Sequence, residues 1–168
     1  MPTRRTFIKI GLLGAAALAA AGGLHRLRQS TPPQRYQLDA AANAALAAIV
    51  PAMLQGALPA PAAPAAAATA TRVQAAIAGL PLSAQKEVAD LFGLLTLAPT
   101  RRLLAGVPDW AEASPDQVAA FLHRWRDHRF ALLQGAYQAL HDLIFGAWYA
   151  DPESWSTIGY PGPAVRFG

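Results

Sequence analysis

The chain has 168 residues, of which 54% are hydrophobic and 14% are charged, and its 14 basic side chains outnumber 10 acidic ones to give a net charge of +4. This length fits one domain. The composition argues against a long charged disordered region and against a lysine-rich nucleic-acid arm, because only two lysines are present. The absence of cysteine excludes disulfides, thiolate zinc sites, iron–sulfur clusters and haem attached through cysteine.

The first 28 residues resemble an export signal. Two arginines follow Thr3, the sequence Phe-Ile-Lys occupies residues 7–9, and an uncharged run rich in Ala, Gly and Leu extends from residue 10 to residue 24. This order resembles the twin-arginine signal, in which Ser or Thr, two arginines, a variable residue, Phe, Leu and Lys precede a weakly apolar segment. The signal residues are Arg4, Arg5, Phe7 and Lys9. Fifteen helical residues reach only about 22 Å, less than the ~30 Å of membrane hydrocarbon, which argues against a transmembrane anchor.

Two fates of this segment stay open. The alanines at residues 19–21 satisfy the small-x-small rule for cleavage after Ala21, whereas basic residues at 25, 26 and 28 suit an uncleaved form that contacts the membrane. Residues 1–21 hold three basic residues and no acid, so they account for three of the four surplus positive charges. The basicity therefore indicates export to the periplasm, and the nearly neutral remainder suits a protein partner better than a nucleic acid.

Residues 29–37 form a polar, proline-containing spacer, and residues 38–168 are predicted to form a single helical domain. Apolar residues from Leu38 to Leu54 recur on one helical face, with Pro51 expected to kink or divide the helix. Alanines and three prolines at residues 56–71 predict a low-complexity connector.

The helical pattern returns at Val73–Leu80 and is stopped by Pro81. Ser83 is expected to cap a further helix, because its hydroxyl can accept a hydrogen bond from the first turn. A short helix over residues 101–105 is expected to end at Gly106.

The sequence Ser-Pro-Asp at residues 114–116 predicts a helix start, with a serine cap, proline first and an acid in the first turn. Apolar residues then recur at helical spacing until Pro152, which predicts either one long helix or two helices joined near His128 or Gly135. No alternating run indicates a strand. The predicted fold class is all-α, an irregular bundle of four to six helices with an extended C-terminal tail rich in Pro, Gly and aromatic residues.

Residues that could carry catalysis or bind metals form no recognised pattern. His123 and His128 are about 140° apart on a helix, whereas two metal ligands on one helical face are three or four residues apart. His25 lies at the edge of the signal, and His141 has no second ligand at helical spacing. We predict no catalytic, cofactor-binding or metal-binding residue in this chain, and a histidine-dependent metalloenzyme stays an alternative.

The charged run at residues 123–129 is interpreted as a solvated helix face or an edge that faces a partner. A nucleic-acid patch is disfavoured because Arg126 and Asp127 partly neutralise each other and because an exported protein leaves the DNA behind. Trp125 is expected to belong to the buried stripe of the same helix.

Residues 148–163 hold four aromatic rings, with glycines and prolines that fix an irregular chain. Trp and Tyr are enriched at interface hot spots, because they combine large apolar area with a polar group. Two roles stay open, contact with a partner and packing on the chain's own helices. The candidate interface residues are Trp125, Trp148, Tyr149, Trp155, Tyr160, Pro161, Gly162 and Pro163.

A resemblance to a known family covers the leader and residues 110–168. It is carried by Phe-Leu-His-Arg-Trp-Arg at 121–126, Trp-Tyr at 148–149, Trp155, and Ile-Gly-Tyr-Pro-Gly-Pro at 158–163. These segments resemble the small helical subunits that accompany flavin-dependent dehydrogenases of the glucose-methanol-choline oxidoreductase type, and are similar to the group described as gluconate 2-dehydrogenase subunit 3-like.

The resemblance implies a non-catalytic subunit that supplies the export signal and stabilises a larger flavoprotein. It places FAD and the substrate site in that large subunit, names a cytochrome c subunit as a further partner, and makes the twin-arginine translocase the export machinery. The alternative left open is a standalone periplasmic or membrane-tethered helical binding or scaffold protein.

Overall fold

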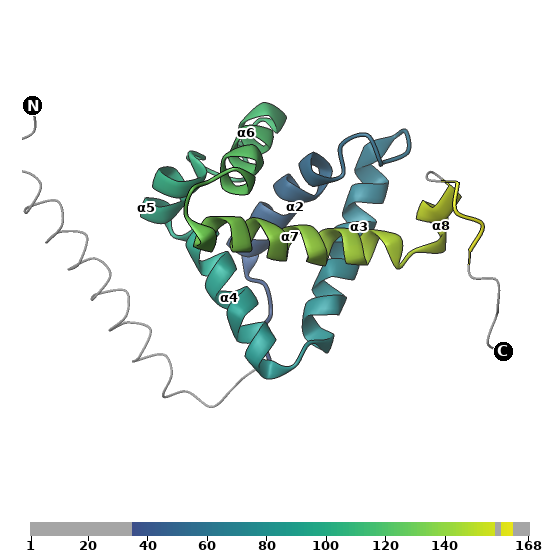
Figure 1. Ribbon diagram of the computed structural model, residues 1–168, viewed down its shortest axis with the longest axis horizontal. Coiled ribbons are helices and arrows are strands. Elements are labelled where there is room, and N and C mark those ends of the chain that lie inside the picture. The colour runs from purple at the N-terminus through teal and green to yellow at the C-terminus, as the bar shows by residue number, and fades with distance from the viewer. Residues whose placement is uncertain (1–34, 157–158, 163–168) are drawn as a thin grey trace, which may run out of the picture. The chain divides into compact units, whose positions relative to one another are not determined.

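A computed structural model describes residues 35–156 and 159–162 of the chain (Figure 1). Every regular element in this part is a helix, which confirms the predicted all-α class. The long helices are α2 (Ala40–Met53), α3 (Ala62–Gly79), α4 (Leu82–Thr96), α6 (Pro115–Arg126) and α7 (Ala131–Tyr149). The short ones are α5 (Ala98–Thr100), the π-helix η1 (Arg101–Ala105) and α8 (Pro152–Trp155).

Helix α2 lies at the centre of the core and packs against α3, α4, α6 and α7. Its apolar residues recur every three or four positions, so that Leu46, Ile49 and Val50 are all buried on one side. Asp39 begins the helix by accepting a hydrogen bond from the amide of Ala42 at 2.8 Å. Helix α7 packs along α3 and α6, while α4 and α7 are not among the helix pairs in close contact.

A buried glutamine joins the beginning of the described chain to the turn between α3 and α4. Gln85 is 3% exposed, and its side-chain oxygen accepts a hydrogen bond from the amide of Tyr36 at 2.8 Å. Its side-chain nitrogen donates to the carbonyl oxygens of Leu80, at 2.8 Å, and Ala78, at 3.3 Å. Because each polar atom of this amide is bonded, its burial costs little. Burial, and then the charge of Asp39, raise the pKa of the Tyr36 hydroxyl to about 12.

The predicted connector at residues 56–71 is wrong from residue 62 onward, where α3 begins. Alanine has the highest helix propensity, and it fills most of this segment. Pro64 is the third residue of α3, where an amide hydrogen would have no partner within the helix. Three prolines therefore did not prevent a helix, because two precede it and the third lies in its first turn.

Two expected helix boundaries also differ from the prediction. Pro51 does not divide α2, which continues to Met53, and the amide of Leu54 still donates to the carbonyl oxygen of Val50 at 3.0 Å. Ser83 is not a helix cap, because α4 begins one residue earlier, at Leu82, directly after Pro81. No side-chain hydrogen bond caps that end.

The segment after residue 114 forms two helices rather than one. Ser114 caps α6 with a reciprocal pair of bonds: its hydroxyl accepts from the amide of Gln117 at 3.3 Å, and the Gln117 side chain accepts from the Ser114 amide at 2.9 Å. The break falls at residues 127–130, where Nδ1 of His128 accepts from the amide of Phe130 at 3.1 Å. Gly135 lies within α7, so the break near His128 is the correct alternative.

Candidate partner interface

The residues of the export motif, Arg4, Arg5, Phe7 and Lys9, lie outside the described part of the chain, as does Pro163. Among residues 35–156 and 159–162, no helix is both long and apolar enough to cross a membrane. The remaining interface candidates fall into two groups that differ in exposure.

Trp125 and Trp148 are buried, at 1% and 3% exposed, so neither presents its ring to a partner. For Trp125 the buried stripe on its helix is confirmed in place of the interface role, and for Trp148 the interface prediction is wrong. Trp125 packs edge-on against Phe121, with ring centroids 4.7 Å apart, and Phe121 packs edge-on against Trp110 at 5.5 Å. The indole nitrogens of Trp110 and Trp125 donate to the carbonyl oxygens of Leu95 (2.7 Å) and Leu104 (3.1 Å). We call Trp110, Phe121 and Trp125 the core aromatic cluster.

In the described residues after α7, several contacts centre on Trp155. The indole nitrogen of Trp155 donates to the carbonyl oxygen of Tyr149 at 2.8 Å, and the Tyr160 amide donates to the carbonyl oxygen of Trp155 at 2.9 Å. The rings of Trp155 and Tyr160 meet edge-on at 5.4 Å. Gly162 has a φ of +92°, and a Cβ there would lie 3.1 Å from the Trp155 ring. In the described part of this segment, residues 151–156 hold the short helix α8, and Tyr160 and Gly162 lie against the Trp155 ring.

Asp151 holds the beginning of this tail against α3. Its carboxylate pairs with Arg72 of α3. The same carboxylate accepts a hydrogen bond from the amide of Glu153 at 3.1 Å and so caps the N-terminal end of α8. With Trp155 half-buried behind them, Tyr149 and Tyr160 remain 39% and 47% exposed, and Pro161 is exposed as well. These residues are the candidates that the structure leaves at the surface.

A row of aromatic side chains on α7 continues this surface along the helix. Tyr137, His141, Phe145 and Tyr149 are four residues apart and therefore lie one above the other. Successive ring centroids are 6.1, 4.4 and 5.8 Å apart, and the closest pair, His141 and Phe145, is stacked. The first three are half-buried, and the row spans about 18 Å at 1.5 Å per residue.

We call this surface the aromatic ridge; its members are Tyr137, His141, Phe145, Tyr149, Trp155 and Tyr160. Its first three residues were not among the interface candidates predicted from the sequence. The signal was present as an aromatic at every fourth position, but the buried stripe of Leu and Ile beside it dominated the helical pattern. A half-exposed row of rings offers a partner large apolar area at low entropic cost, because each ring is already held by its neighbours.

The charged run at residues 123–129 has mainly local roles. Arg124 donates to the carbonyl oxygen of Ala105 at 2.6 Å and closes the end of η1. Gly106 has a φ of +67°, in the left-handed region that favours glycine, and Nη2 of Arg124 lies 2.7 Å from the place that a Cβ would take. Arg126 and Asp127 form two hydrogen bonds, at 3.0 and 3.1 Å, and these lower the pKa of the aspartate.

No group of three or more His, Asp or Glu side chains that could hold a metal ion occurs among residues 35–156 and 159–162. His123 is exposed, and His128 uses one ring nitrogen to accept the backbone bond already described. His141 shares a hydrogen bond of 3.1 Å with Asp142, which, together with a bond from Gln138, lowers the pKa of that carboxylate. The histidines described thus have separate surroundings.

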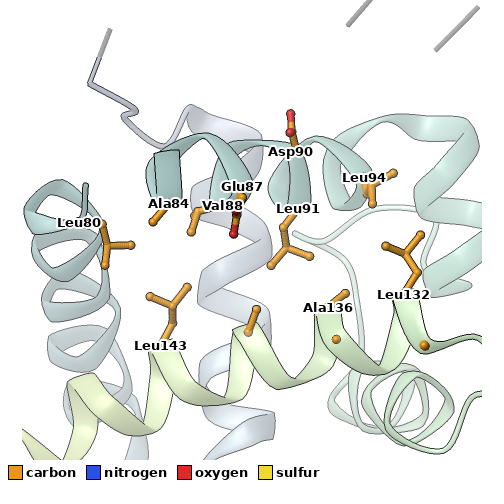
Figure 2. A pocket seen from close by; sticks show the side chains of 13 residues that line it. Leu80, Ala84, Glu87, Val88, Asp90, Leu91, Leu94, Leu132, Ala136 and Leu143 are labelled. Carbon is orange, nitrogen blue, oxygen red and sulfur yellow. The ribbon is translucent and has the colours of Figure 1, made fainter. Parts of the chain in front are cut away.

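A second surface feature is an apolar groove of about 620 Å³ between α4 and α7 (Figure 2). Leucine, valine and alanine side chains of α4 face small and aliphatic side chains of α7 across it. Leu80, at the end of α3, closes one end. The groove is separate from the aromatic ridge, with which it shares no residue.

Comparison with known proteins adds no relative, since no family description, curated protein or solved structure matches this chain.

Proposed function

We propose that this chain is the non-catalytic small subunit of a flavin-dependent dehydrogenase of the glucose-methanol-choline type. It escorts the large subunit through the twin-arginine export route and stabilises it in the periplasm. In this proposal FAD and the substrate site belong to the large subunit, and a cytochrome c subunit receives the electrons.

The observation that carries the proposal is the presence, in one chain, of a sequence that resembles a twin-arginine motif and a half-exposed row of aromatic rings. The motif stands at Arg4 and Arg5, and the surface is the aromatic ridge. Tyrosine and tryptophan dominate interface hot spots, and in the ridge Tyr149 and Tyr160 combine high exposure with fixed position. The resemblance of residues 110–168 to the small dehydrogenase subunits supplies the class of partner.

The export role is tested by co-expressing the chain with a flavoprotein of this type encoded beside it and measuring flavoprotein in the periplasm. Replacing Arg4 and Arg5 by lysine is expected to remove both proteins from the periplasm, because the translocase would no longer recognise the only signal. The matched control replaces Arg26 and Arg28 by lysine, which changes the same residue type outside the motif and should leave export intact.

Full recovery of flavoprotein in the periplasm with the Arg4→Lys, Arg5→Lys variant would contradict the proposal that this chain directs its export. A genome that encodes no such flavoprotein beside this chain would also contradict the proposal.

A standalone helical binding protein is the second candidate, and the groove between α4 and α7 favours it because binding modules need a concave surface. Gel filtration of periplasmic material separates the two functions. A flavin-free monomer argues for the second, and co-elution with a flavoprotein argues for the first.

A further inference from the structure

The groove between α4 and α7 lies between two helices that are not among the closely packed pairs, and its lining is mostly apolar. Val88 and Leu91 of α4 face Ala136 and Leu143 of α7 across it (Figure 2). Both helices pack on α2, which supports them from beneath. Packed helices approach to 8–10 Å, so two helices that share a support without packing closely on each other leave a groove that a third element can fill.

The walls of the groove suit an α-helix rather than an extended peptide. Both walls are helices, whose backbone groups are already bonded, so an extended peptide would bury its own amide and carbonyl groups without partners. On α7 the small residues Ala131, Gly135 and Ala139 recur every fourth position and form one line on the helix surface. Small residues in such a line let a second helix approach closely.

Space is available at the middle of that line. A Cβ built on Gly135 would meet nothing within 4 Å, so this position opens onto the groove. At one end Leu132 is 74% exposed, which leaves a large apolar side chain without cover. The lined stretch of α7, from Ala131 to Leu143, is about 18 Å long, or more than three helical turns.

The charge at the groove is acidic. Its charged lining residues are Glu87 and Asp90 of α4, and Figure 2 shows the Glu87 carboxylate pointing toward the groove and the Asp90 carboxylate pointing away from it. Asp90 pairs with Lys86 at 3.0 Å, whereas Glu87 forms no ion pair with any residue in the part of the chain that the structure describes. A partner that brings Lys or Arg beside Glu87 would therefore complement this wall.

A small molecule fits the groove less well than a helix does. Ligand pockets combine apolar walls with several polar groups that converge on the ligand. Here the lining is aliphatic apart from the two carboxylates of α4.

We propose that the α4–α7 groove receives an amphipathic helix of a partner protein, with the apolar face of that helix between Leu91 and Leu132 and a Lys or Arg beside Glu87. This proposal concerns a surface apart from the aromatic ridge and does not depend on the export function.

The test uses the full chain expressed in its own host, with the photo-crosslinking amino acid p-benzoylphenylalanine in place of Leu132. The control carries the same probe in place of Leu103, which is 83% exposed and does not line the groove. The crosslinked peptide is sequenced by mass spectrometry. We expect the probe at 132 to capture a segment with apolar residues every three or four positions and a Lys or Arg at its side.

Two substitutions decide whether the captured helix occupies the groove. Gly135→Leu fills the open space and raises helix propensity, so the chain should stay folded while crosslinking at 132 falls at least about tenfold. Gly146→Leu is the control, since that position on α7 is also open but lies beyond the groove. Glu87→Gln should lower the yield about two- to fivefold, as for an exposed ion pair, while Glu112→Gln should not.

The proposal is overturned if the probe at 132 captures a second copy of this chain, lipid, a small molecule or a segment without helical apolar spacing. It is also overturned if the 132 probe captures nothing beyond the 103 control, or if Gly135→Leu and Gly146→Leu give the same yield. Circular dichroism of each variant confirms that the helices are retained.

Discussion

The core aromatic cluster and the aromatic ridge use similar residue types in opposite surroundings. In the cluster, Trp110 and Trp125 are buried and each indole nitrogen donates to a backbone carbonyl of another element. In the ridge, Tyr149 and Tyr160 are exposed, while the indole nitrogen of Trp155 donates to a carbonyl oxygen only six residues earlier in the chain. The cluster therefore joins α6 to the segment between α4 and α6, whereas the ridge presents rings outward.

The difference teaches that aromatic residues stabilise the fold where their polar groups reach distant backbone, and remain available to a partner where those bonds are local. Leu95 and Leu104 lie 15 and 21 residues from the tryptophans they bond, but Tyr149 lies only six residues from Trp155. Long-range bonds of this kind fix the relative positions of helices, so their loss should be felt in global stability. Loss of a local bond should be felt only in the tail.

The largest expected effect is on stability. Trp125→Ala should lower the free energy of unfolding by about 3–5 kcal/mol, because it leaves a cavity beside Phe121 and an unpaired carbonyl at Leu104. Tyr149→Ala, in the ridge, should cost about 1 kcal/mol or less. Urea unfolding followed by far-UV circular dichroism, which reports helix content rather than tryptophan fluorescence, measures both free energies of unfolding. Equal losses would show that the ridge belongs to the core after all.

The next effect is on affinity for the flavoprotein, where substitutions in the aromatic ridge should matter more than substitutions in the core aromatic cluster. Replacing Tyr149 and Tyr160 together by alanine should weaken the complex with the flavoprotein at least about thirtyfold, the loss expected for hot-spot residues worth about 2 kcal/mol or more. The control is Leu103→Ala, which removes a more exposed apolar side chain away from the ridge. Calorimetric titration of the purified partners gives the dissociation constants. Unchanged affinity in the double variant would leave the ridge without this role.

The sequence predicts the helical class and the Ser114 cap well, because both depend on local pattern. Apolar spacing marks the long helices apart from the first half of α3, and Ser-Pro-Asp at residues 114–116 marks the start of α6, where Gln117 completes a reciprocal cap. The sequence predicted a connector at residues 62–71, where α3 begins, because a proline breaks a helix or fits its first turn depending on where the helix starts. That start depends on the packing of α3 against α2 and α7.

The candidate site was less predictable, since exposure is a property of packing between helices. Trp125, Trp148 and Trp155 are all tryptophans, but the fold buries the first two and leaves Trp155 half-buried. The groove could not be predicted from the sequence either, because the pattern of α4 and that of α7 each indicate an ordinary amphipathic helix. Only their placement on α2 leaves the two faces apart.

The smallest expected effect is a pH dependence of stability at Asp142, which bonds His141 of the aromatic ridge. Hydrogen bonds from His141 and then from Gln138 hold the pKa of Asp142 below its ordinary value of 3.8. Because the folded-state pKa is lower than the unfolded one, this carboxylate stabilises the fold above about pH 3.8, and the contribution is lost as the pH falls through the lower folded-state value.

Gln138→Ala removes one of the two donors, whose nitrogen lies 2.7 Å from Oδ1 of Asp142. The pKa of Asp142 should then rise toward 3.8, which NMR titration of the side-chain carboxyl carbon measures directly. The pKa of Asp127, set chiefly by its hydrogen bond with Arg126 on α6, should stay where it is and serves as the internal control. An unmoved Asp142 would mean that His141 alone sets its pKa, and the aspartate would then report on the stacked ring of the ridge.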